Sequence, residues 1–89
     1  MTATASTIPL RVRVQDAWDE VELDLAPGTT VEELKARALA RFRIRRDPAG
    51  YVVKFRGAEV LDETATLADA GIVANAALIV LPRRRRPVR

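Results

Sequence analysis

The sequence predicts a small α+β domain in which one helix packs across a β-sheet. Three observations predict this class: two early runs of alternating hydrophobicity, one amphipathic run with helix-capping signals, and two later apolar runs. With 89 residues the chain can build one core, because a domain of this size buries about 60–65% of its unfolded surface. We assign residues 1–7 to a flexible N-terminal segment, 8–82 to the domain and 83–89 to a basic, disordered tail.

The first predicted element is an antiparallel hairpin. Apolar residues occupy alternate positions from Ile8 to Val14, and a second run, from Val21 to Leu25, alternates in the opposite phase. The polar residues between the two runs, 15–19, are few enough for a turn. On the exposed face, basic side chains are expected to lie opposite acidic ones, with Arg11 and Arg13 facing Glu22 and Asp24.

A helix is predicted after Pro27-Gly28, which breaks the second strand. Thr30 and Glu33 have the spacing of a capping box, in which the Thr30 hydroxyl accepts from the Glu33 amide and the Glu33 carboxylate reaches back. Acidic residues stand at the start and basic residues near the end, as the helix dipole favours. The predicted apolar face comprises Val31, Leu34, Ala38, Leu39 and Phe42.

Two more strands are predicted after the turn signal at residues 47–50. The run from Tyr51 to Arg56 alternates, and the run from Ala76 to Leu81 is apolar and long enough for a strand inside a sheet. Between these strands, Thr66 is placed to cap a single helical turn that Gly71 closes.

The composition excludes most catalytic chemistry. The chain has no cysteine and no histidine, which removes disulfides, thiolate nucleophiles, zinc sites and Ser–His catalysis together. The carboxylate pairs Glu32-Glu33 and Asp62-Glu63 are expected at exposed element ends, where capping and solvation account for them. We therefore expect a protein that is not an enzyme, with no catalytic residues, no metal site and no cofactor.

The net charge of +3 comes from the end of the chain, where five arginines fall between residues 83 and 89. The preceding 82 residues hold 10 basic and 12 acidic side chains. The N-terminal stretch lacks the basic and apolar regions of a signal peptide, and no run approaches the roughly 18 apolar residues of a transmembrane segment. The expected location is the cytoplasm.

Four segments carry a family resemblance: Thr30-Val31-Glu32-Glu33-Leu34-Lys35, Phe55-Arg56-Gly57, Thr66-Leu67-Ala68-Asp69-Ala70-Gly71-Ile72 and Ala77-Leu78-Ile79-Val80-Leu81. In this order they resemble the ubiquitin-like β-grasp family over about residues 8–81. The resemblance implies a mixed sheet in spatial order 2-1-5-3, with one helix packed across it and with the first and last strands central and parallel. The chain is also similar to small ubiquitin-like accessory proteins of bacterial type VII secretion.

This resemblance implies a non-catalytic module that binds protein partners through the sheet face opposite the helix. By strand phase, Ile79 and Leu81 point outward on this face. Basic residues are expected to flank them, with Arg11 and Arg13 on one side and Lys54 and Arg56 on the other. An exposed apolar stripe of this kind favours a partner whose surface is apolar and acidic. The alternatives are that strand packing alone explains the apolar residues, or that the tail folds back over them, and that the charges are merely solvated.

Trp18 and the basic tail are two further candidates. Trp18 at the hairpin tip either anchors a partner or covers the stems of its neighbours. The tail arginines, Arg83, Arg84, Arg85 and Arg86, have three interpretations: a solvated segment, contact with an acidic protein or membrane surface, and contact with nucleic acid. No aromatic residue is interleaved with them, so base stacking is not expected there.

Two alternative functions remain open from the sequence. One is a divergent ubiquitin-like modifier of a bacterial ubiquitination-like pathway. The modifiers of the family end in Gly-Gly, whereas this sequence ends Arg86-Pro87-Val88-Arg89, so conjugation through the terminus is not expected. The other is a nucleic-acid accessory that acts through the Arg-rich tail. The partner and the oligomeric state are not predicted.

Overall fold

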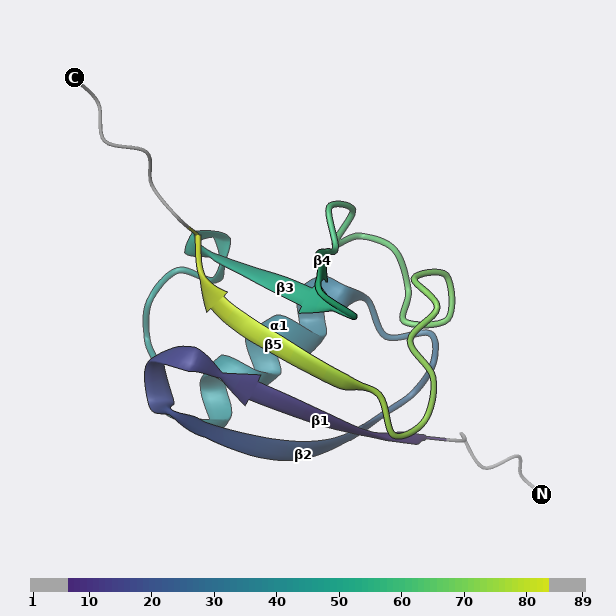
Figure 1. Cartoon of the computed structure of the whole chain (residues 1–89), viewed down its shortest axis with the longest axis horizontal. Helices are drawn as coiled ribbons and strands as arrows, with labels where there is room; N and C mark the ends of the chain where they lie inside the picture. The colour runs from purple at the N-terminus through teal and green to yellow at the C-terminus, as the bar shows by residue number, and fades with distance from the viewer. Residues whose placement is uncertain (1–6, 84–89) are drawn as a thin grey trace.

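The structure is a computed structural model that describes residues 7–83, and it consists of a five-stranded sheet with one α-helix across it (Figure 1). The strands are β1 (Ile8–Val14), β2 (Asp19–Leu25), β3 (Tyr51–Phe55), β4 (Ala58–Glu59) and β5 (Ala77–Pro82). The helix α1 spans Val31–Arg41, and two short 3₁₀ helices are η1 (Gln15–Ala17) and η2 (Pro48–Gly50).

The sheet is mixed, with spatial order β2-β1-β5-β3-β4. The predicted order 2-1-5-3 is confirmed, and the short β4 adds an edge strand that the sequence did not predict. The outer pairs β1–β2 and β3–β4 are antiparallel, whereas β1 and β5 run parallel at the centre. A parallel pair needs a long crossover, and here α1, β3 and β4 all lie between its two strands in the chain.

One hydrophobic core lies between α1 and the sheet (Figure 1). β1, β2 and β5 alternate between buried and exposed residues, because successive side chains point to opposite faces. The predicted alternation is not seen in the burial of β3, whose first three residues, 51–53, are all buried. Leu34 on the helix and Val12, Val53 and Val80 on the three central strands are fully buried. The predicted apolar face of the helix is confirmed, with Phe42 only partly buried at its end.

The N-terminal cap of α1 is half of the predicted capping box. The Thr30 hydroxyl accepts from the Glu33 amide at 3.2 Å, as expected. The Glu33 carboxylate does not reach back, because Arg37, one turn further on, donates to it from Nη2 at 2.8 Å and Nε at 3.0 Å. A charged donor gives a stronger hydrogen bond than a neutral amide, so Glu33 turns outward.

The segment between β4 and β5 is held against the start of α1. The Val31 amide donates to the Ala65 carbonyl at 3.0 Å, and the Glu32 amide donates to the Glu63 carbonyl at 2.8 Å. These contacts satisfy amides that a helix N-terminus leaves without partners. Thr66 caps the following turn, since its hydroxyl accepts from the Asp69 amide at 3.1 Å, although this segment is a turn rather than a helix.

The hairpin register differs from the prediction at one pair. Arg11 faces Glu22 as expected, but Arg13 faces Glu20, and Asp24 lies opposite Pro9. In an antiparallel pair, two steps forward on one strand match two steps back on the other. The Arg11–Glu22 pair therefore fixes Glu20 as the neighbour of Arg13, and Asp24 cannot face it.

Candidate protein-binding face of the sheet

The outer face of β5 carries the predicted apolar stripe. Ile79 is 41% exposed and Leu81 is partly exposed, whereas Leu78 and Val80 between and beside them are buried. The phase predicted for this strand is therefore confirmed. Since β5 lies between β1 and β3, Ile79 stands at the centre of the sheet face that α1 does not cover.

Strand register places basic residues directly beside this stripe. Arg13 of β1 and Lys54 of β3 are both paired with Ile79, from opposite sides. Arg11 is paired with Ala77, two residues before Ile79 on β5. Three of the four predicted flanking residues thus meet around one exposed apolar side chain.

The two basic flanks differ in how their charge is balanced. Glu20 on β2 lies between Arg11 and Arg13, with Oε2 4.0 Å from Arg11 Nε and Oε1 3.9 Å from Arg13 Nη2. Among residues 7–83, Lys54 has no carboxylate within 4.0 Å. Glu59 is nevertheless paired with Lys54 across β3 and β4, so both basic flanks have an acidic neighbour on the adjacent outer strand.

The structure separates Arg56 and Trp18 from this group. Arg56 follows the last residue of β3 in a left-handed conformation, φ 57°, and its guanidinium lies over the Phe55 ring, 5.2 Å from the centroid. Phe55 is opposite Leu78 and packs on the core side, so Arg56 does not extend the basic flank. Trp18 lies at the hairpin tip beyond the last β1–β2 pair and is 88% exposed.

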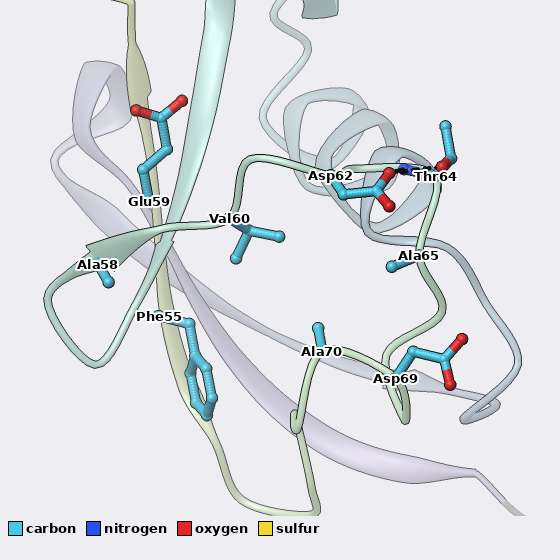
Figure 2. A pocket seen from close by; sticks show the side chains of 9 residues that line it. All are labelled: Phe55, Ala58, Glu59, Val60, Asp62, Thr64, Ala65, Asp69 and Ala70. Carbon is cyan, nitrogen blue, oxygen red and sulfur yellow. Dashed lines mark hydrogen bonds between the residues drawn. The ribbon is translucent and has the colours of Figure 1, made fainter.

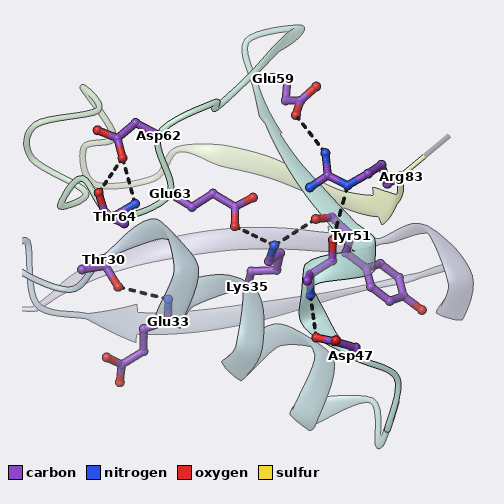
Figure 3. A network of polar contacts seen from close by, with 11 residues as sticks. Thr30, Glu33, Lys35, Asp47, Tyr51, Glu59, Asp62, Glu63, Thr64 and Arg83 are labelled. Atoms are coloured by element: carbon purple, nitrogen blue, oxygen red, sulfur yellow. Dashed lines mark hydrogen bonds and ion pairs between the residues drawn. The ribbon is translucent and has the colours of Figure 1, made fainter. Parts of the chain in front are cut away.

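A polar network behind the sheet contains a buried lysine that the sequence analysis missed (Figure 3). Lys35 is 2% exposed, and its Nζ lies 2.6 Å from Glu63 Oε1 and donates to the Tyr51 carbonyl at 2.9 Å. Position 35 falls within the helical stripe of Val31, Leu34 and Ala38, which is the signal that could have revealed its burial. Glu63 is thus not a solvated carboxylate, contrary to expectation.

Arg83, assigned to the tail from sequence, contacts the domain. Its amide donates to the Gly50 carbonyl at 2.7 Å, its Nε donates to the Ala49 carbonyl at 3.3 Å, and its Nη1 lies 4.0 Å from Glu59 Oε2. The contact between the Arg83 side chain and Glu59 appears in the upper right of Figure 3. The other candidates of the tail, Arg84, Arg85 and Arg86, lie outside the described residues.

An open hollow between β3, β4 and the segment after β4 has acidic and apolar walls (Figure 2). Phe55, Val60 and Ala70 contribute apolar surface. Asp62 lies on its border and turns toward Thr64, accepting from its amide at 3.1 Å and from its hydroxyl at 2.5 Å. The capping role expected for Asp62 is confirmed, since its carboxylate closes the turn at residues 62–64.

Residues 7–83 contain no cluster of three or more acidic, cysteine or histidine residues that could hold a metal ion. Within that same range, α1 is the one α-helix, and it is too short and too polar to be a membrane span.

No protein-family model matches the sequence, and no curated protein matches it. Solved structures do match the fold. A ubiquitin of Caldiarchaeum subterraneum superposes with a TM-score of 0.75 at 17% identity, over 92% of this chain and 100% of that one. The ubiquitin-like domain of an Arabidopsis thaliana protein gives a TM-score of 0.74 at 16% identity, over 99% of this chain and 89% of that one.

A protein designed on the basis of ubiquitin gives a TM-score of 0.76 at 19% identity, over 97% of this chain and 100% of that one. With the strand order and the helix across the sheet, these matches establish that the chain has the ubiquitin-like β-grasp fold. The fold that the resemblance implied is therefore confirmed.

Proposed function

We propose that the chain is a non-catalytic ubiquitin-like module that binds a protein partner through the outer face of its sheet. The observation that carries the proposal is the position of Ile79, an exposed apolar residue on a central strand between Arg13 and Lys54. Apolar side chains at the middle of a surface, bordered by charge, are typical of residues that dominate protein interfaces.

The partner that suits this face has an apolar patch for Ile79 and Leu81 and a carboxylate for Lys54. The apolar contact would supply most of the affinity, because it is desolvated on binding. The charges would act mainly on the association rate and on its salt dependence. We propose a bacterial, cytoplasmic assembly as the setting, for which an accessory role in secretion is one candidate.

The test uses a double variant, Ile79→Ser with Leu81→Ser, in affinity capture from the source cells followed by titration of the captured partner. Both side chains point away from the helix-covered core, so the variant should stay folded. We expect affinity for the partner to fall about thirtyfold, the equivalent of roughly 2 kcal/mol.

The matched control is Leu61→Ser with Val73→Ser. These residues are 85% and 59% exposed and lie in segments outside the strands. This control removes more exposed apolar surface than the tested pair does, yet it should leave binding unchanged. Full binding by the Ile79 and Leu81 variant, or an equal loss in the control, would overturn the proposed face.

A further inference from the structure

Three segments that are distant in the sequence meet at one end of the molecule (Figure 1). They are the hairpin turn around η1, the connection from α1 to β3, and the residues that follow β5. The Tyr51 hydroxyl donates to Asp16 Oδ2 at 2.6 Å, and Arg46 Nη1 lies 3.8 Å from the same oxygen. The Arg83 amide donates to the Gly50 carbonyl, which brings the end of β5 to the same place.

This end of the molecule is strongly basic, and we call it the basic end, made up of Arg43, Arg45, Arg46 and Arg83 with Trp18. All four arginines are exposed. Three carboxylates stand among them: Asp16 accepts from Tyr51, Asp47 accepts from the Ala49 amide at 2.9 Å, and Glu59 lies 4.0 Å from Arg83.

The charge of the basic end contrasts with the rest of the described chain. Residues 7–83 hold 11 basic and 12 acidic side chains, so the remainder of this part is acidic. The sequence then continues from Arg83 with four further arginines in six residues. Four of the 11 basic side chains of residues 7–83 therefore belong to the basic end.

Trp18 is in an unfavourable position for stability alone. It has a left-handed backbone, φ 55°, which is uncommon for a bulky residue, and its side chain is 88% exposed. Glycine would adopt this φ without strain. Strain at an exposed aromatic residue that adds nothing to the core is a reason to look for a ligand.

We propose that the basic end binds the surface of an anionic lipid bilayer, with Trp18 entering the headgroup region and the arginines meeting lipid phosphates. Trp is favoured at membrane interfaces, because its ring is apolar and its N–H is polar. Clustered arginines are attracted to the negative potential of such a surface. Ile79 is not part of the basic end, but Lys54 and Leu81 line one hollow with Arg83, so this site adjoins the sheet face.

The placement of aromatic residues favours a bilayer over single-stranded nucleic acid. Proteins that bind single strands stack successive bases on several aromatic side chains along a groove. The four aromatic residues of this chain are Phe42, Tyr51, Phe55 and Trp18, and of these Trp18 alone is exposed, whereas the others are buried or partly buried. One aromatic side chain on a protruding turn suits insertion into a planar surface better than stacking along a strand.

The experiment mixes the full chain with vesicles of phosphatidylcholine and phosphatidylserine, and with vesicles of phosphatidylcholine alone. Trp18 is the sole tryptophan, so its emission reports directly on this site. We expect a blue shift and co-sedimentation with the anionic vesicles, weakened by salt, and neither with the neutral vesicles. No shift with the anionic vesicles would overturn the proposal.

Two variants and one control locate the contact. Arg43→Ser with Arg45→Ser should lower vesicle partitioning about thirtyfold, since each arginine near an anionic surface contributes about 1 kcal/mol. The control variant, Arg37→Ser with Arg56→Ser, removes the same amount of charge at positions outside the basic end. It should lower vesicle partitioning far less. An equal loss in both pairs would show attraction by net charge alone and would overturn the site.

Trp18→Gly, followed by co-sedimentation, tests the insertion itself. This variant should be at least as stable as the original chain, because it removes the strained φ, and yet it should bind the anionic vesicles more weakly. Unchanged vesicle binding would overturn the role of Trp18. Quenching of Trp18 by an oligodeoxythymidine without any vesicle response would assign the basic end to nucleic acid and overturn the bilayer proposal.

Discussion

The Lys35 ammonium and the Glu63 carboxylate form an ion pair beneath the surface, with 2.6 Å between Nζ and Oε1. The lysine side chain is 2% exposed and the glutamate side chain 19%. Lys35 also donates to the carbonyl of Tyr51, so one ammonium joins α1, β3 and the segment after β4. In the part of the chain that the structure describes, no buried side-chain polar atom lacks a hydrogen-bond partner.

Glu63→Ala should lower the free energy of unfolding by about 2–4 kcal/mol, because it leaves the Lys35 charge buried without its counter-ion. Because Glu63 is partly exposed, this loss in unfolding free energy should be smaller than for a wholly buried ion pair. Urea denaturation of the variant and the original chain measures the loss. The double variant Lys35→Met with Glu63→Leu should recover most of the loss, since well-packed apolar residues can replace a buried pair.

The exposed pair Glu33–Arg37 is the control for this prediction. Its atoms approach to 2.8 Å, nearly as close as the buried pair, but both side chains are at least half exposed. Arg37→Ala should change the unfolding free energy by about 0.5 kcal/mol or less. Equal costs for the two pairs would contradict the burial of Lys35.

Tyr51 should make the stability of the domain fall in alkali. Burial, followed by its hydrogen bond to Asp16, raises the pKa of the Tyr51 phenol above its ordinary value of 10.0. The unfolded chain then loses this proton at a lower pH than the folded chain does. The contribution of the protonated Tyr51 phenol to the free energy of unfolding is full below pH 10.0. It is lost as the pH rises through the pKa of Tyr51 in the folded protein.

Tyr51→Phe should remove this part of the alkaline decline, although the variant loses about 1–1.5 kcal/mol near neutral pH with the hydrogen bond to Asp16. The unfolding free energies of both proteins, measured by denaturation from about pH 8 to pH 11, should show this difference. Tyr51 is the sole tyrosine, so the absorbance of its phenolate follows its own ionisation. An ordinary titration near 10.0 would contradict the raised pKa.

Leu34→Ala should cost about 2–5 kcal/mol, because Leu34 is fully buried between α1 and the sheet and its truncation leaves a cavity. Glu32→Ala on the exposed side of the same helix should change stability little. Denaturant midpoints measure both changes. Similar shifts for the two variants would mean that the helix buries a different face.

Most of the fold could be predicted, because it follows from local periodicity. The alternation of β1 and β5 and the spacing of Val31, Leu34 and Ala38 identify the buried face of each element without reference to the others. The strand order came from the family resemblance. The two-residue β4 was not predicted, since a strand of that length has no period to detect.

The candidate site was predicted less completely, because it depends on contacts between distant segments. The meeting of Ile79, Arg13 and Lys54 could be predicted, because the predicted strand phase and the predicted strand order were both right. Arg56 could not be placed, because its left-handed turn follows the strand and breaks the alternation. The contacts of Arg83 with residues 49 and 50 depend on how β5 ends against the start of β3.

The central position of β5 has a consequence for synthesis of the chain. The β1–β2 hairpin and the β3–β4 pair share no strand contact except through β5, which is the last strand of the described residues. Until β5 has been made, β1 therefore presents an unpaired edge that can join other chains. Folding must wait for contacts between residues 11–14 and 77–80, and such non-local pairing is slow. The nascent chain is exposed to aggregation or proteolysis until nearly all of the described residues have been translated.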